Sequence, residues 1–139
     1  MTHQINQILL CGLLLISVPV QAETIALIAH RDSPQRTLSR QEAADLFLGK
    51  RRSLDGQSLI PIDNSDEQLQ AVFYEAVADM SPTRMKAYWA RLVFAGQGRP
   101  PPKISLNDAV ERINRDSNAL TYVYAKTIPR NAKVLLRLQ

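Results

Sequence analysis

Short apolar runs alternate with amphipathic stretches along the chain, and this alternation predicts strands separated by helices. Four runs have the length and composition of buried strands. They are Thr24–Ala29, Leu59–Ile62, Ala119–Ala125 and Val134–Leu138. Four stretches between these runs repeat apolar residues at helical spacing. The resulting order, β-α-β-α-α-α-β-β, predicts one α/β domain in which a small mixed sheet is flanked by helices.

The expected helices carry start and stop signals. Ser39 and Glu42 have capping-box spacing, and Gly49 is placed to end the same helix. The pair Ser81-Pro82 is typical of a cap followed by a first helical residue, and Ser105 of a further cap. Each helix has an apolar face that is expected to meet the core. These faces consist of Ala43, Leu46 and Phe47; Leu69, Val72, Phe73, Ala76, Val77 and Met80; Met85, Tyr88, Trp89, Leu92 and Val93; and Leu106, Ala109, Val110 and Ile113.

The first residues have the pattern of an export signal. The stretch Ile8–Val20 is apolar apart from one serine, and Val20-Gln21-Ala22 offers small residues where signal peptidase requires them. We therefore expect a signal peptide over 1–22, cleavage after Ala22, a mature domain over 23–139 and a periplasmic location. The alternative is an uncleaved membrane anchor, but the apolar run is shorter than the roughly 20 residues that span a bilayer. Cys11 does not predict lipidation, because Leu10 stands where a small residue is needed.

Composition limits the chemistry that the mature domain can carry. His30 is its only histidine and it contains no cysteine, so no transition-metal site and no cofactor are expected. The cluster Asp63, Asp66 and Glu67 lacks the ligand spacing of a calcium loop and is more typical of a helix N-terminus. No nucleophile, base and orienting group can be assembled, and the segment GQGRPPP at 96–102 is not a phosphate loop. We therefore expect no catalytic residues, no metal and no enzyme activity.

Charge is the feature that points toward a partner. The formal net charge is +4, and no acidic residue occurs from Met80 to Asn107, a stretch that contains five basic residues. Arg84 and Arg91 lie seven residues apart and therefore share a helical face. This stretch is either an ordinary solvated face or a site for a small anion or an acidic partner surface. Nucleic acid is not expected, because the aromatic residues have the spacing of a core rather than of a stacking platform.

Three segments resemble one known family. They are LSRQEAADLFLGKRRSLDGQSLIPID (Leu38–Asp63), KAYWARLVFAGQGRPP (Lys86–Pro101) and NALTYVYA (Asn118–Ala125). Together they resemble short members of the type 2 periplasmic-binding protein superfamily, similar to phosphate ABC transporter substrate-binding proteins. The resemblance implies a fold corresponding to one lobe of such a protein, with phosphate as the ligand.

The resemblance also implies where the anion would bind, and the chain departs from the family there. In the family, an arginine and a Ser-Gly-Thr helix start follow the second strand and hold the phosphate, partly through helix-terminal amides. Here the equivalent stretch is Asp63–Gln68, and both elements are missing. Asn64, Ser65 and, from the later loop, Arg99 remain as candidate ligand contacts.

Two functions follow. The first is an exported solute-binding-protein-like domain that binds phosphate or another small anion. The second is a ligand-free interaction module that docks on a membrane sensor, transporter or envelope protein. A homodimer would rebuild a two-lobed cleft from single lobes. After cleavage of the leader, the protein is not expected to be an integral membrane protein.

Overall fold

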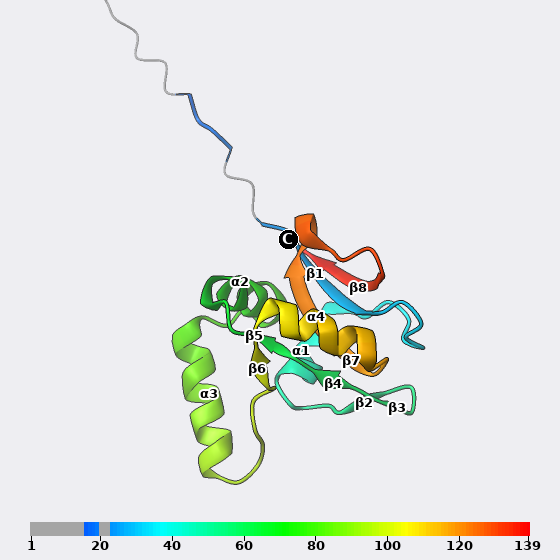
Figure 1. Ribbon diagram of the computed structural model, residues 1–139. Coiled ribbons are helices and arrows are strands. Elements are labelled where there is room, and N and C mark those ends of the chain that lie inside the picture. The colour runs from blue at the N-terminus through cyan, green and yellow to red at the C-terminus, as the bar shows by residue number, and fades with distance from the viewer. Residues whose placement is uncertain (1–15, 20–22) are drawn as a thin grey trace, which may run out of the picture.

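The computed structural model describes residues 16–19 and 23–139, and it has a mixed sheet with helices on both faces (Figure 1). The strands are β1 (Ile25–His30), β2 (Ser53–Leu54), β3 (Gln57–Ser58), β4 (Ile60–Pro61), β5 (Asp63–Asn64), β6 (Lys103–Ile104), β7 (Ala119–Tyr124) and β8 (Ala132–Leu138). The helices are α1 (Arg40–Phe47), α2 (Glu67–Ala78), α3 (Pro82–Phe94) and α4 (Leu106–Arg115), with a short 3₁₀ turn at Ala125–Thr127. The predicted leader and its cleavage site fall mostly on residues outside this description. Within the described residues, no helix is long and apolar enough to cross a membrane.

The main sheet has the strand order β4-β7-β1-β8. Strand β1 pairs antiparallel with both β7 and β8, whereas β4 pairs parallel with β7. Along β1 the side chains alternate between two apolar clusters, as the pleat of a strand requires. Leu27 belongs to the cluster shared with α1 and α2, and Ile28 to the cluster that includes Leu106 of α4. The sheet is therefore a layer between α1 and α2 on one side and α4 on the other.

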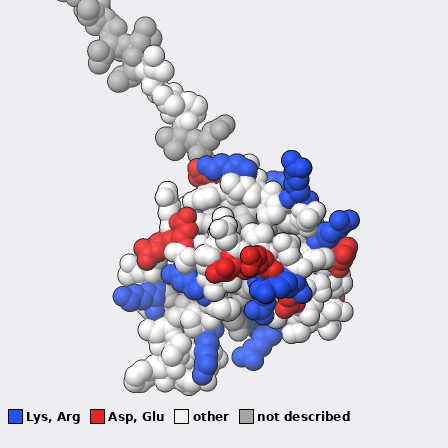
Figure 2. Space-filling view, in the orientation of Figure 1, with Lys and Arg blue, Asp and Glu red and all other residues white. Residues whose placement is uncertain are grey.

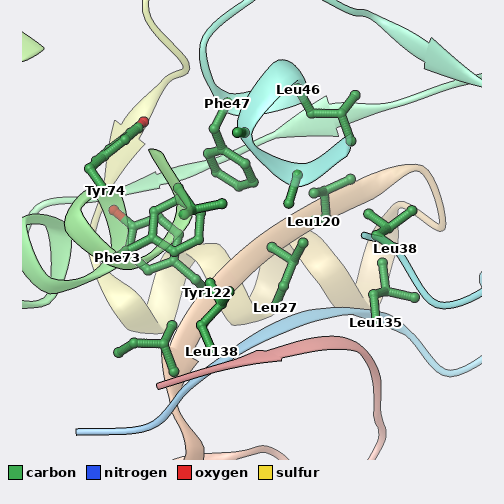
Figure 3. Close-up of a cluster of buried hydrophobic side chains, with 14 of the residues drawn as sticks. Leu27, Leu38, Leu46, Phe47, Phe73, Tyr74, Leu120, Tyr122, Leu135 and Leu138 are labelled. Carbon is green, nitrogen blue, oxygen red and sulfur yellow. The ribbon is translucent and has the colours of Figure 1, made fainter. Parts of the chain in front are cut away.

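The largest side chains of the core form an aromatic cluster beneath α1 and α2 (Figure 3). The rings of Phe73 and Tyr122 are stacked, with centroids 3.8 Å apart and planes 6° apart. Phe47 meets both rings edge-on, at 4.8 Å from Phe73 and 5.7 Å from Tyr122. Such pairs are favourable beyond the burial of apolar area. They fix α1 and α2 to β7.

The predicted starts of α1, α3 and α4 are confirmed, whereas α2 ends at Ala78, so Met80 follows the helix on whose apolar face it was expected. The Ser39 hydroxyl accepts a hydrogen bond from the amide of Glu42, and the Glu42 carboxylate accepts one from the amide of Ser39, so both halves of the capping box form. Ser81 and Ser105 cap α3 and α4 in the same position. Gly49 follows the end of α1 with φ of +72°, a conformation that glycine adopts without the steric cost of a Cβ atom.

One predicted strand is divided. The run Leu59–Ile62 was expected as a single strand, but only Ile60–Pro61 pairs with β7. The following residues, Asp63–Asn64, pair in parallel with Lys103–Ile104 as a separate two-stranded sheet. The chain changes partners at this point: the amide of Ile62 donates to the carbonyl of Leu120 on β7, and the amide of Asp63 donates to the carbonyl of Pro102, just before β6.

Helix α3 lies at the edge of the domain, and its last turn extends beyond the body (Figure 1). Its first half is attached to the end of α1: the Tyr88 hydroxyl donates a 2.7 Å hydrogen bond to the carbonyl of Leu48, and Trp89 packs beside Gly49. Val93 is 52% exposed and Phe94 97% exposed. The expectation that Val93 faces the core is therefore wrong, because no other element covers this turn within the described residues.

Candidate functional site

The junction between β5 and α2 holds two of the predicted ligand contacts. Asn64 is only 1% exposed; its Oδ1 accepts a 2.8 Å hydrogen bond from the amide of Asp66. Its Nδ2 is buried and has no hydrogen-bond partner among the described residues. The Ser65 side chain is exposed, and its amide donates to the carbonyl of Ile104 at 2.9 Å. The amide of Ser65 is therefore already used in joining β5 to β6.

The first amides of α2 are also occupied. Asp66 is the N-cap, and its Oδ1 accepts hydrogen bonds from the amides of Gln68 at 3.0 Å and Leu69 at 3.1 Å. A helix N-terminus favours negative charge, and here the chain supplies that charge itself. An external anion at this position would have to displace Asp66 and would also meet Glu67.

Beneath this junction lies a buried carboxylate. Asp63 is 3% exposed, and both of its oxygens accept hydrogen bonds. Oδ1 accepts from the amide of Asn64 and the hydroxyl of Tyr122, and Oδ2 from Gln70 Nε2 at 2.9 Å and the Tyr74 hydroxyl at 3.0 Å. All four donors are uncharged, so the negative charge is solvated by the protein without a partner cation at hydrogen-bond distance.

The same network changes the acidity of two tyrosines. Burial raises the pKa of Tyr74 well above its ordinary value of 10.0, and the charge of Asp63 raises it further. Burial also raises the pKa of Tyr122, with the charge of Asp63 as the next cause. Both hydroxyls therefore stay protonated at neutral pH and act as fixed donors to Asp63.

The third predicted contact, Arg99, lies in a different place. It lines an open cleft of about 650 Å³ between the end of α1, the edge strand β4 and the loop that leads from α3 to β6. Arg51 and Arg52 line the same cleft, and no acidic residue lines it. We call this the arginine cleft. Its remaining walls are Leu46, Gly49, Leu59, Ile60, Pro61, Val93, Gly96, Gln97, Gly98, Pro100, Pro101 and Pro102.

The three arginines of the cleft are exposed, and within the described residues none of them has a carboxylate within 4.0 Å. In Figure 2, the part of the visible face that lies nearest the free end of α3 carries basic side chains and no acidic ones. By contrast, Arg84 and Arg91 of α3 each have a partner on or next to their own helix. Arg84 donates to the carbonyl of Asp79 at 3.0 Å, and the Arg91 guanidinium lies 5.8 Å from the centre of the Tyr88 ring. The arginine cleft is therefore a concentration of positive charge that internal ion pairs do not neutralise.

The structure brings Asn64 and Ser65 together but not with Arg99, because neither of them lines the arginine cleft. The basic run Lys50–Arg52 is visible in the sequence, but nothing in the sequence places it beside Arg99. The signal was a basic tripeptide directly after the helix-ending Gly49, since residues there must turn away from α1. In the described part of the chain, no group of three or more His, Cys, Asp or Glu side chains is placed to hold a metal ion.

The fold confirms the predicted class, a small mixed α/β sheet flanked by helices, and it is similar to part of two solved substrate-binding proteins. Two solved structures carry this comparison. One, from Clostridium perfringens, is described as a phosphate ABC transporter substrate-binding protein with bound phosphate; it has a TM-score of 0.60 and 14% identity. The other, from Vibrio cholerae, is described as an ABC-type phosphate transport receptor; it has a TM-score of 0.53 and 11% identity.

The alignments cover 84% of this chain but only 46% and 47% of the two longer chains. The chain thus matches less than half the length of these transport proteins. At this identity the likeness establishes the fold. No protein-family model matches the sequence, and no curated protein matches it.

Proposed function

We propose that the chain is an exported, periplasmic solute-binding-protein-like domain that binds phosphate or a similar small oxyanion in the arginine cleft. The observation that carries the proposal is the convergence of Arg51, Arg52 and Arg99 on one cleft that no acidic residue lines. The two structural neighbours are described as phosphate-transport proteins, which supports the choice of anion. The signal peptide over 1–22 would deliver the domain to the periplasm.

Each arginine has a defined part in this proposal. A guanidinium group offers parallel N–H donors that match two oxygens of a phosphate, and it stays charged at every physiological pH. Arg99 would contact the anion from the loop before β6, and Arg51 and Arg52 from the segment after α1. Because the cleft is open to water, its charges are screened by salt, and we expect an affinity that falls as ionic strength rises.

Asn64 and Ser65 form a second candidate position for the same ligand. Binding there would require Asp66 to release the first amides of α2, and the unpartnered Nδ2 of Asn64 would be a donor for the anion. The arginine cleft needs no such rearrangement. We therefore place the anion in the cleft and treat the β5–α2 junction as the position that a variant must test separately.

Isothermal titration of the purified protein with phosphate, and in parallel with sulfate, tests the proposal. We expect binding that is lost in Arg99→Gln and in the double variant Arg51→Gln/Arg52→Gln. Arg130→Gln removes an equally exposed charge outside the cleft and should leave the affinity unchanged. Loss of binding in Asn64→Ala or Ser65→Ala, with the arginine variants unaffected, would move the site to the β5–α2 junction. No heat with either anion at low salt would reject anion binding.

The interaction module stays the second candidate function, and the exposed end of α3 favours it. Val93 lines the arginine cleft and Phe94 follows it, so an uncovered apolar turn adjoins unneutralised positive charge. An acidic envelope protein would complement this combination, whereas like charges would oppose the same face of a second copy. Sedimentation velocity of the wild type and of Phe94→Ser distinguishes the cases, because a homodimer through this turn would dissociate in the variant.

A further inference from the structure

A second cavity, of about 580 Å³, lies between α2, α3 and the proline-rich segment before β6. Its size falls within the range of small-molecule sites, about 300–1,000 Å³. It is lined by Asp63, Glu67, Gln70, Ala71, Tyr74, Pro82, Met85, Lys86, Trp89, Pro100, Pro101 and Lys103. We call it the α3 cavity.

The α3 cavity differs from the arginine cleft in its charges, which are balanced. Asp63 and Glu67 come from the β5–α2 segment, Lys86 from α3 and Lys103 from β6. In the part of the chain that the structure describes, no acidic group lies within 4.0 Å of either lysine, and no basic group within 4.0 Å of either carboxylate. Opposite charges therefore border one cavity without pairing across it.

Asp63 adds a buried negative charge to the wall of the cavity. Its carboxylate is held by four uncharged donors, so its hydrogen-bonding capacity is filled while its negative charge is not balanced by a bonded cation. A cationic group in the cavity would be attracted to this charge without needing a hydrogen bond from it. Glu67, which is exposed and free of ion pairs among the described residues, would supply the direct acceptor.

The remaining walls of the cavity are suited to an apolar body. Trp89, Met85 and the proline pair Pro100-Pro101 are apolar wall residues, and Tyr74 lies beside the acidic end, where its hydroxyl donates to Asp63. Aromatic faces also attract an ammonium group. A ligand that is complementary to all of these walls has a positive group, a negative group and an apolar part.

We infer that the α3 cavity binds a free α-amino acid with an apolar side chain, its ammonium group toward Glu67 and Asp63 and its carboxylate toward Lys86 and Lys103. The α3 cavity shares Pro100 and Pro101 with the arginine cleft but none of its three arginines. A zwitterion bridges the unpaired charges of the cavity, whereas a simple anion or a simple amine leaves one pair unsatisfied. The two sites would give the domain two ligands of different chemistry.

The chain contains a single tryptophan, and it lies in the wall of this cavity. Tryptophan fluorescence of the purified protein therefore reports on the α3 cavity, and calorimetry supplies the affinity. The probe is L-leucine. Three analogues each remove one part of it: 4-methylpentanoate lacks the ammonium group, 3-methylbutylamine lacks the carboxylate, and glycine lacks the apolar body. We expect L-leucine to shift the emission. Each analogue should bind more weakly by about tenfold or a larger factor, since each loses a charged hydrogen bond or the apolar contact.

Variants locate the binding. Glu67→Gln, Lys86→Gln and Lys103→Gln should each weaken the binding of L-leucine by about tenfold. Glu111→Gln and Lys126→Gln make the same changes at exposed positions away from the cavity and should have no effect. Equal binding of 4-methylpentanoate and L-leucine would overturn the inference, as would L-leucine binding that the three cavity variants do not change. No fluorescence change and no heat with millimolar L-leucine would overturn it as well. Because the arginine variants above leave this cavity intact, failure of anion binding and failure of amino-acid binding are distinguishable.

Discussion

The hydroxyl group of Tyr122 on β7 donates a hydrogen bond to the carboxylate of Asp63 on β5, a residue 59 positions earlier in the chain. This bond connects the main sheet to the small sheet formed by β5 and β6. A hydrogen bond to a charged group contributes about 1.5–3 kcal/mol. We expect Tyr122→Phe to lower the free energy of unfolding by that amount, measured by urea denaturation at pH 7.

Tyr124→Phe is the matched control for that change. The Tyr124 hydroxyl has no hydrogen-bond partner among the described residues, and the side chain is only partly buried. Its replacement should change the free energy of unfolding by no more than about 0.5 kcal/mol. Equal effects of the two substitutions would show that Asp63 does not depend on Tyr122.

The buried tyrosines predict a loss of stability at alkaline pH. The pKa values of Tyr74 and Tyr122 are raised in the folded state, mainly by burial, from an ordinary value of 10.0. Above pH 10 the unfolded chain loses these protons while the folded chain keeps them, so the unfolded state binds fewer protons and stability falls as pH rises. The contribution is fully present below pH 10.

Ultraviolet absorbance at 295 nm measures this directly. At pH 10.5 the native protein should show less tyrosinate than the same protein in urea, and the free energy of unfolding should decline as the pH rises from 10 to 11. In Tyr74→Phe the decline should be shallower, because one of the two retained protons is removed. Identical tyrosinate absorbance in the native and unfolded proteins would contradict the prediction.

Two features of Gly49 oppose its replacement, its backbone conformation and its contact with Trp89, and their effects can be measured separately. An alanine at this position would have to adopt φ of +72°, and its Cβ atom would lie 3.3 Å from Cη2 of Trp89. Gly56 has nearly the same backbone conformation, φ of +77°, but no atom lies within 4 Å of a Cβ at that position. We expect both Gly49→Ala and Gly56→Ala to destabilise by about 1–2 kcal/mol through the backbone. Only Gly49→Ala should also shift the Trp89 fluorescence, because it displaces α3 from α1.

The capping box of α1 makes a further prediction. Ser39→Ala removes the acceptor for the Glu42 amide and should cost about 1 kcal/mol. The exposed Ser117, which has no side-chain hydrogen bond among the described residues, provides the control in Ser117→Ala. Urea denaturation of both variants gives the comparison. A Ser39→Ala protein as stable as the control would mean that Glu42 and Arg36, 2.9 Å apart, hold this helix start without the serine.

Local signals were enough to predict the helices. The residues Ser39, Ser81 and Ser105 begin helices because their hydroxyl groups satisfy amides a few positions away, and this chemistry is visible within a short window of sequence. Local chemistry also explains the turn between β2 and β3, where Asp55 and Gly56 both have positive φ. The central apolar strands followed from composition alone.

The candidate sites depended on distant contacts. Asp63 was expected at a solvated helix start, yet Tyr74 and Tyr122 bury it, and nothing next to it in the sequence indicates this. Asp66, three residues later, does cap α2 as expected. Arg99 reaches Arg51 and Arg52 only because the loop after α3 returns to the end of α1, and the path of a loop is not encoded in the periodicity of the segments that it joins.

The position of β1 between β7 and β8 has a consequence for how the protein is made. The first strand of the described domain pairs on one side with residues 120–124 and on the other with residues 132–138, so both partners are synthesised long after it. Contacts between such distant parts of a chain form slowly, because the intervening segment must first be closed into a loop. In a nascent chain, Ile25–His30 cannot pair with either neighbouring strand until residues 120–138 have been synthesised. Assembly of the main sheet is thereby postponed until these two late strands are present.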